Sequence, residues 1–146
     1  MRYLTKEWYA LMQECGRAFE PRKQAELQKR LDDVSAAFQQ AIEREDLPKE
    51  LRENFYFHDG VIRGIREGTD CVIEIDSPFS VYHRVTFRDA VVKQDTIPVG
   101  AVWLYAELYR HHLGYEAHIL CESRQGLRDT KIICTDILFE EEQYFS

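Results

Sequence analysis

The chain of 146 residues lacks the features that mark several large classes of protein. No apolar run approaches the roughly 20 residues that a membrane span requires, and the opening residues Met1–Glu7 lack the apolar core of a secretion signal. It contains no glycine-rich phosphate loop, dinucleotide fingerprint or nucleophile elbow. These absences predict a cytoplasmic protein with no membrane partner and no cofactor, and they favour a non-catalytic role.

Cysteine is scarce and scattered. Cys15, Cys71, Cys121 and Cys134 form no C-x-x-C pair, so their spacing does not match a zinc site. Three of them stand among Ile, Val and Leu. The pattern predicts reduced thiols that pack as small hydrophobic side chains.

Basic residues are outnumbered, with 19 Lys and Arg against 26 Asp and Glu, for a net charge of −7. Residues 1–54 carry −1 of this charge and residues 55–146 carry −6. A surface of this sign repels phosphate groups, so nucleic-acid binding is not expected. The composition favours another protein as the partner, one with a basic or uncharged surface.

The first third of the chain has the 3.6-residue period of helices. Thr5 can cap a helix over residues 5–15, and Pro21 suits the first turn of a second helix over residues 21–46. Pro48 ends the second helix, and a short third helix is expected over residues 49–54. The strongest signal is a single apolar stripe along the second helix, made of Leu27, Leu31, Val34, Phe38, Ala41 and Ile42.

From Gly60 the apolar period changes to the two-residue alternation of strands. Strands are expected over residues 61–66, 71–76, 81–93, 101–111, 115–122 and 128–139, and the third of them is expected to bulge near Asp89. Residues 101–112 also fit a helix, but the matching strand that follows Gly114 favours strand.

Together these patterns predict an α+β fold, with two N-terminal helices packed on an antiparallel meander of about six strands. One domain covers the chain, with a helical part (1–54), a sheet part (55–139) and an acidic tail (140–146).

Strand alternation gathers chemically distinctive side chains on one face of the predicted hairpin. If His112 pairs with Tyr115, that face is aromatic, acidic and histidine-bearing. Two interpretations stay open: it is a binding surface for a partner, or it is a half-exposed strand face or one covered by the helices. Its candidate binding residues are Trp103, Tyr105, Glu107, Tyr109, His111, Glu116 and His118.

Histidine offers two weaker hypotheses. His111 and His118, with Glu107 and Glu116 near, could hold a metal ion, but they match no known motif. His58 and Asp59 stand where the helices give way to the sheet, so they are candidates for a metal site in a small metal-dependent hydrolase. The alternative, which we favour, is that Asp59-Gly60 forms a turn and that His58 anchors a loop.

The opening Met-Arg-Tyr-Leu-Thr-Lys-Glu-Trp-Tyr (Met1–Tyr9) resembles the start of an uncharacterised family of small bacterial proteins, a domain of unknown function. Phe57–Asp59, and Trp103–Tyr105 leading to Gly114–Glu116, look similar as well. The resemblance implies an intracellular bacterial protein and supplies no catalytic residue. The sheet half also looks like acidic immunity proteins of bacterial toxin systems, which implies an immunity-like or regulatory binding role.

Overall fold

The computed structural model describes residues 1–141 as three helices followed by eight strands. The predicted α+β fold, with its helices N-terminal to an antiparallel sheet, is confirmed. No helix within these residues is both long and apolar enough to cross a membrane. The elements are α1 (Lys6–Arg17), α2 (Pro21–Glu45), α3 (Lys49–Asn54), β1 (Gly60–Glu67), β2 (Cys71–Asp76), β3 (Tyr82–Arg88), β4 (Val91–Gln94), β5 (Val102–His111), β6 (Gly114–Ser123), β7 (Gly126–Cys134) and β8 (Asp136–Glu141).

The sheet has eight strands, not about six, because two of the predicted strands each divide. The first breaks at Asp89, whose φ of 47° lies in the left-handed region, and gives β3 and β4. The second breaks at Thr135 and gives β7 and β8. β8 continues to Glu141, so the prediction that the acidic tail starts at residue 140 was wrong. Residues 142–146 of that tail lie outside the described residues.

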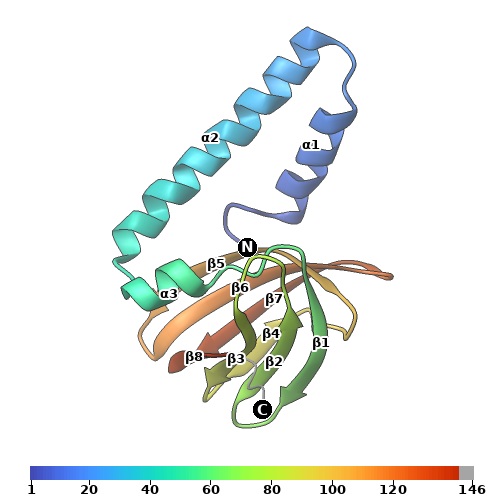
Figure 1. The fold of residues 1–146 in the computed structure, drawn as a ribbon. Coiled ribbons are helices and arrows are strands. Elements are labelled where there is room, and N and C mark those ends of the chain that lie inside the picture. Colours follow the sequence, from blue (N-terminus) through green and yellow to red (C-terminus); the bar gives the residue numbers. More distant parts are fainter. Residues whose placement is uncertain (142–146) are drawn as a thin grey trace.

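The strand order is β4-β7-β6-β5-β1-β2-β3-β8, and neighbouring strands are antiparallel. The predicted meander was wrong because β3 pairs with β8 at one edge while β4 pairs with β7 at the other. Figure 1 shows the sheet curled around its inner face, where β3 approaches β7. That face holds the main core, whose largest fully buried side chains include Phe57, Ile62, Ile73, Phe87, Trp103, Ile119 and Ile132.

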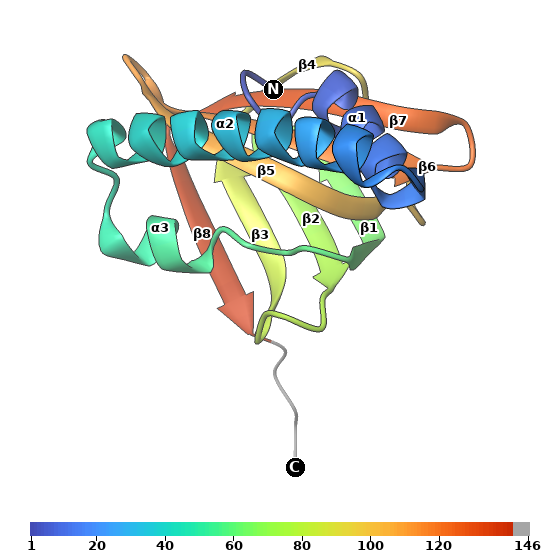
Figure 2. The same ribbon diagram turned by 90° about the horizontal axis from the view of Figure 1, so that it is seen from above.

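Helices α1 and α2 form a hairpin that we call the helical arm (residues 6–45). Both lie on one side of the sheet, with α2 crossing β5, and the far end of the arm stands away from the sheet (Figures 1 and 2). The predicted cap is present, because the Thr5 hydroxyl accepts a hydrogen bond from the Trp8 amide at 3.1 Å. The far half of the arm holds only a small core of its own, centred on Cys15, Leu27 and Leu31.

All four cysteines are free thiols and buried, as predicted. Burial raises the pKa of Cys121 to about 12, so this thiol stays protonated at neutral pH. Burial also raises the pKa of Cys71 and Cys134 to about 12. Thiols in this state are poor nucleophiles and poor metal ligands, so these three cysteines serve as core side chains.

Candidate functional site

The prediction that Trp103 shares a face with Tyr105 was wrong. β5 carries a β-bulge between these two residues, so Leu104 is an extra residue in the pairing with β6. An extra residue shifts strand alternation by one position. Trp103 therefore points into the core against Phe55 and Phe57, and only 1% of it is exposed.

Glu107 and Tyr109, which follow the bulge, do share one face of β5, but they pair with different residues of β6 from the predicted ones. Glu107 lies opposite His118, and Tyr109 lies opposite Glu116. His111 pairs with Gly114 at the hairpin end, so the predicted His112–Tyr115 pairing was wrong by two positions. Because of this shift His118 lies opposite Glu107, and within residues 1–141 no group of His, Cys, Asp and Glu that could hold a metal ion forms around His111.

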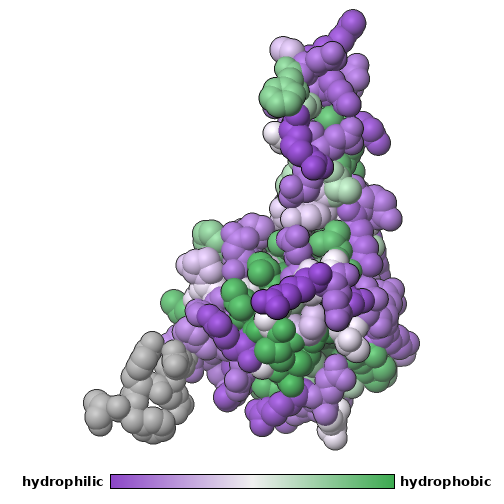
Figure 3. Space-filling view, turned by 90° about the vertical axis from the view of Figure 1, so that its right-hand side faces the viewer, coloured by the Kyte–Doolittle hydropathy of each residue, from purple (hydrophilic) through white to green (hydrophobic). Residues whose placement is uncertain are grey.

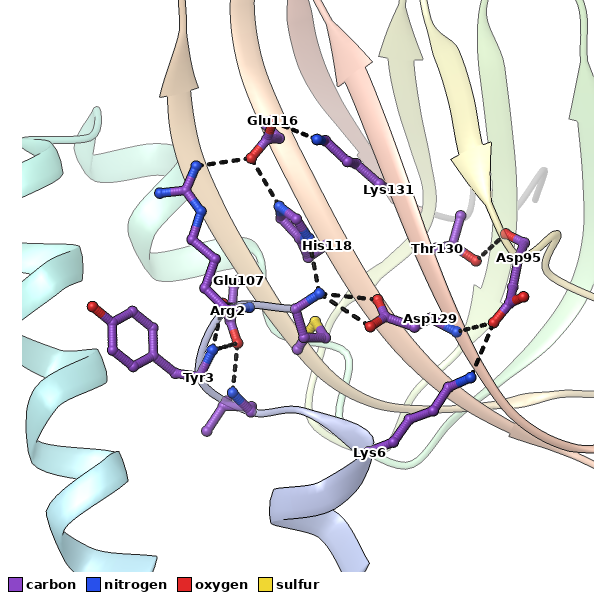
Figure 4. A network of polar contacts seen from close by, with 12 residues as sticks. Arg2, Tyr3, Lys6, Asp95, Glu107, Glu116, His118, Asp129, Thr130 and Lys131 are labelled. Carbon is purple, nitrogen blue, oxygen red and sulfur yellow. Dashed lines mark hydrogen bonds and ion pairs between the residues drawn. The ribbon is translucent and has the colours of Figure 1, made fainter.

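Glu107 anchors the start of the chain (Figure 4). Its carboxylate accepts hydrogen bonds from the backbone amides of Arg2 at 2.9 Å, Tyr3 at 3.1 Å and Leu4 at 2.7 Å, and also from the Tyr109 hydroxyl. Only 1% of Glu107 is exposed. A buried carboxylate with four donors is fully satisfied, so this arrangement fixes the path of residues 2–4 across the sheet.

Glu116 is the second carboxylate of this network (Figure 4). It lies 2.9 Å from the Arg2 guanidinium, 2.9 Å from His118 Nε2 and 3.2 Å from the Lys131 ammonium. Burial would raise the pKa of Glu116, but hydrogen bonds from His118, Lys131 and Arg2 outweigh it and hold the pKa at about 2. The Arg2 guanidinium also stacks 3.8 Å from the centre of the Tyr109 ring.

Two aspartates complete the network. The Met1 amino group lies 3.0 Å from His118 Nδ1 and donates to both carboxylate oxygens of Asp129 at 3.1 Å. Asp95 accepts from the Asp129 amide at 2.9 Å and pairs with Lys6 at 3.3 Å. Burial lowers the pKa of His118, and the neighbouring cationic amino group adds to this effect against the pull of Glu116.

These groups are called the anchor cluster below: Met1, Arg2, Lys6, Asp95, Glu107, Tyr109, Glu116, His118, Asp129 and Lys131. Its buried side chains bind one another and the backbone of residues 2–4, and only 5% of His118 and 7% of Glu116 are exposed. The face that alternation predicted is therefore covered by the chain itself. The cluster is an internal network of hydrogen bonds and ion pairs, in which each charged group has a partner within the chain.

A cleft of about 650 Å³ lies between α2, α3 and β5. Its lining is mainly apolar. One wall is formed by Phe38 and Ile42 of α2, Leu47 of the loop that follows, and Leu51 of α3. The opposite wall is formed by Leu104, Ala106 and Leu108 of β5. Trp103 and Tyr105, two of the predicted binding residues, also line it. The cleft is therefore an apolar site that borders the main core, unlike the charged anchor cluster.

His58 lies at the end of the cleft and joins it to the surface. Its Nδ1 bonds to the carbonyl oxygen of Leu104, the bulged residue. A carbonyl only accepts hydrogen bonds, so His58 Nδ1 is the donor in this contact. Nε2 lies 3.6 Å from an Asp59 carboxylate oxygen. The bulged residue Leu104 thus has two effects: it places Trp103 in the core, and its carbonyl oxygen accepts the hydrogen bond from His58.

Two exposed aromatic residues surround His58, and we call Tyr56 and Phe79 the aromatic rim. The Tyr56 ring stacks on His58 at 6.1 Å, and the Phe79 ring lies 6.1 Å from both. Tyr56 is 55% exposed and Phe79 is 58% exposed. Sequence reasoning missed both because they lie in loops, although aromatic residues in polar loops such as Ser77–Ser80 are a usable signal.

The hypothesis of a metal-dependent hydrolase requires a metal site that includes His58 and Asp59. Within residues 1–141, no three His, Cys, Asp or Glu side chains are grouped so that they could hold a metal ion. The Ser77 hydroxyl, which is near His58, bonds to the His58 backbone carbonyl at 3.4 Å and not to its ring. Within residues 1–141, the His58 ring therefore has an acidic neighbour and makes no hydrogen bond to a Ser, Thr or Cys side chain.

Comparisons with known proteins give no relative for this chain. No family model, no curated protein and no solved structure matches it. The resemblance of Met1–Tyr9 to an uncharacterised bacterial family thus stays an expectation.

Proposed function

We propose that this protein is a non-catalytic protein-interaction module that binds its partner through the cleft and the aromatic rim. The observation that carries the proposal is that two aromatic rings, each more than half exposed, stand around His58 at the end of an apolar cleft of about 650 Å³. Binding cavities measure roughly 300–1,000 Å³. Clustered aromatic residues beside a pocket are typical of interface hot spots.

The charges near the rim indicate the chemistry of the partner. Asp59 follows His58, and Asp76 ends β2 just before the loop that carries Phe79; more than half of each aspartate side chain is exposed. The chain as a whole carries −7. A partner that places a large apolar side chain in the cleft and a basic residue beside it would match both features.

The experiment is site-specific photo-cross-linking in cells of the source organism. A photoreactive phenylalanine analogue replaces Tyr56 in one variant and Val91 in the control. Val91 is 53% exposed on the edge strand β4, which is not part of the cleft. We expect a discrete adduct from position 56 and none from position 91.

A second substitution shows whether the cleft itself is needed. Ile42 is half-buried on its helical wall, so Ile42→Asp places a charge in the cleft without emptying the core. We expect this change to abolish the adduct at position 56. Adducts of equal yield from both positions, or an adduct that Ile42→Asp leaves unchanged, would contradict the proposal.

A further inference from the structure

Three aromatic rings form a continuous strip from α1, across β5, to the residue pair that precedes β1. The ring of Tyr9 on α1 lies 6.4 Å from that of Tyr105 on β5, and the Tyr105 ring lies 5.2 Å from that of His58. All three side chains are half-buried, so each keeps part of its surface exposed. We call Tyr9, Tyr105 and His58 the aromatic strip.

A carboxylate stands at each end of the aromatic strip. At one end, Glu122 accepts a hydrogen bond from the Tyr9 hydroxyl at 3.3 Å. At the other end, an Asp59 carboxylate oxygen lies 3.6 Å from His58 Nε2. Both acidic residues are exposed. Within residues 1–141 neither of them forms an ion pair with a lysine or an arginine, so their charges are not compensated by the basic side chains of this part of the chain.

Both negative charges act on the rings between them. Burial is the main cause of the raised pKa of Tyr9, and the charges of Glu122 and Asp59 add to it. Burial is also the main cause of the raised pKa of Tyr105, to which Tyr9 and Asp59 contribute. A cation on the aromatic strip is therefore attracted toward both ends.

The surface on this side of the molecule is of mixed polarity. Figure 3 faces the side on which α1 and β1 lie in Figure 1, and it shows hydrophobic groups among hydrophilic ones below the helical arm. A surface of this kind suits a ligand that has apolar as well as charged parts. A bare metal ion does not fit, because within residues 1–141 no three His, Cys, Asp or Glu side chains are grouped to hold one.

We propose that the aromatic strip binds a linear diamine, with one ammonium group at Glu122, the other at Asp59, and the carbon chain across the rings. Exposed carboxylates pair with ammonium groups, and the faces of aromatic rings attract them. The methylene groups of an extended amine pack against apolar surface, as the stem of a lysine side chain does. A single ammonium group reaches only one of the two carboxylates. This inference does not require that the cleft binds a protein.

The first test is an NMR titration of the full chain, isotope-labelled in its tyrosine rings, with cadaverine and with pentylamine. Pentylamine has the same carbon chain but one ammonium group. We expect cadaverine to shift the ring signals of Tyr9 and Tyr105 with a dissociation constant of about 0.1–1 mM, because each exposed contact is weak. We expect pentylamine to bind roughly threefold to fivefold more weakly.

Two substitutions of similar shape test the two ends of the strip. Asp59→Asn keeps a residue type that tolerates the left-handed conformation of this position, where φ is 61°. Glu122→Gln keeps an acceptor for the Tyr9 hydroxyl. We expect each change to reduce the affinity for cadaverine to about that for pentylamine. Glu26→Gln is the matched control, because it removes the same charge from an exposed position of α2 in the far half of the helical arm. It should leave the affinity for cadaverine unchanged.

Three results would overturn the inference. Equal affinities for cadaverine and pentylamine, or an equal loss of affinity in Glu26→Gln, would show a general attraction of cations to an acidic chain. A dipeptide of two lysines with both ends blocked carries the same two ammonium groups on a bulkier backbone. If the dipeptide bound more tightly than cadaverine, the strip would belong to a protein-binding surface and would not be a diamine site.

Discussion

The anchor cluster and the cleft are built on alternating residues of the same strand, β5, and they are opposite in character. In the anchor cluster the buried charges are paired within the chain, and the backbone of residues 2–4 covers them. In the cleft, apolar side chains of α2 and β5 face each other across an open space of about 650 Å³. Polar groups that satisfy one another stabilise the fold, whereas Phe38 and Ile42 in the wall of the cleft are only half-buried.

The largest expected effect concerns the centre of the anchor cluster. Glu107→Ala leaves three backbone amides and the Tyr109 hydroxyl without their acceptor in a buried site. We expect the free energy of unfolding, measured in urea, to fall by roughly 5 kcal/mol. Glu122→Ala is the control, because Glu122 is exposed and accepts only from Tyr9, and it should cost under about 0.5 kcal/mol. Equal losses would mean that residues 2–4 are not anchored as described.

The next effect tests the bulge at Leu104. Trp103 is 1% exposed and packs against Phe55 and Phe57, so Trp103→Ala removes a core side chain. We expect a loss of roughly 4 kcal/mol in the free energy of unfolding. A loss below about 1 kcal/mol would instead place Trp103 on the surface, as uninterrupted alternation would have it.

The sequence predicted the helices closely and the sheet only in part, for a physical reason. The 3.6-residue stripe from Leu27 to Ile42 and the Thr5 and Pro21 signals depend on neighbouring residues, so they can be read locally. A bulge at Leu104 or a left-handed Asp89 changes one residue's conformation without changing the apolar pattern around it. The errors in strand count, strand order and the face of Trp103 all come from such single positions.

The candidate site was harder still to predict from the sequence. Glu107 meets residues 2–4 across more than 100 positions, and no local pattern indicates this contact. The stripe on α2 predicted a helix facing the sheet, but it could not indicate that Phe38 and Ile42 would line an open cleft. That opening depends on where the helical arm stands on the sheet, which is set by packing of whole elements.

A third prediction concerns pH and the anchor cluster. The pKa of Glu116 is about 2 in the folded chain, below its ordinary value of 4.5. Its stabilising effect is therefore complete above pH 4.5 and is lost as the pH falls from 4.5 toward 2, which removes about 3 kcal/mol. The lowered pKa of His118 acts in the same direction at the higher end, below its ordinary 6.5, because protonation favours the unfolded chain.

Urea unfolding at a series of pH values measures this dependence. Glu116→Gln should flatten the acid limb of the stability curve, and Glu122→Gln should leave it unchanged. An acid limb of the same slope in Glu116→Gln would mean that other carboxylates carry the pH dependence.

The smallest effect on stability is expected where the effect on binding is largest. Tyr56→Ala and Phe79→Ala remove side chains that are 55% and 58% exposed, so each should change the free energy of unfolding by under about 0.5 kcal/mol. Phe57→Ala is the matched control, because Phe57 adjoins Tyr56 in sequence but is fully buried, and its loss should cost roughly 4 kcal/mol.

The same rim variants should lose the protein adduct formed from the rim. A photoreactive residue at the control position Val91, which is 53% exposed on β4, forms no adduct in any of them. Each variant keeps one photoreactive residue on the rim. It stands at position 79 in Tyr56→Ala and at position 56 in Phe79→Ala. If the rim stabilised the fold, Tyr56→Ala and Phe79→Ala would resemble Phe57→Ala, and the free energy of unfolding and the adduct yield would fall together. Stable variants that no longer capture a partner would instead separate the two regions by role, the anchor cluster for folding and the cleft with its rim for binding.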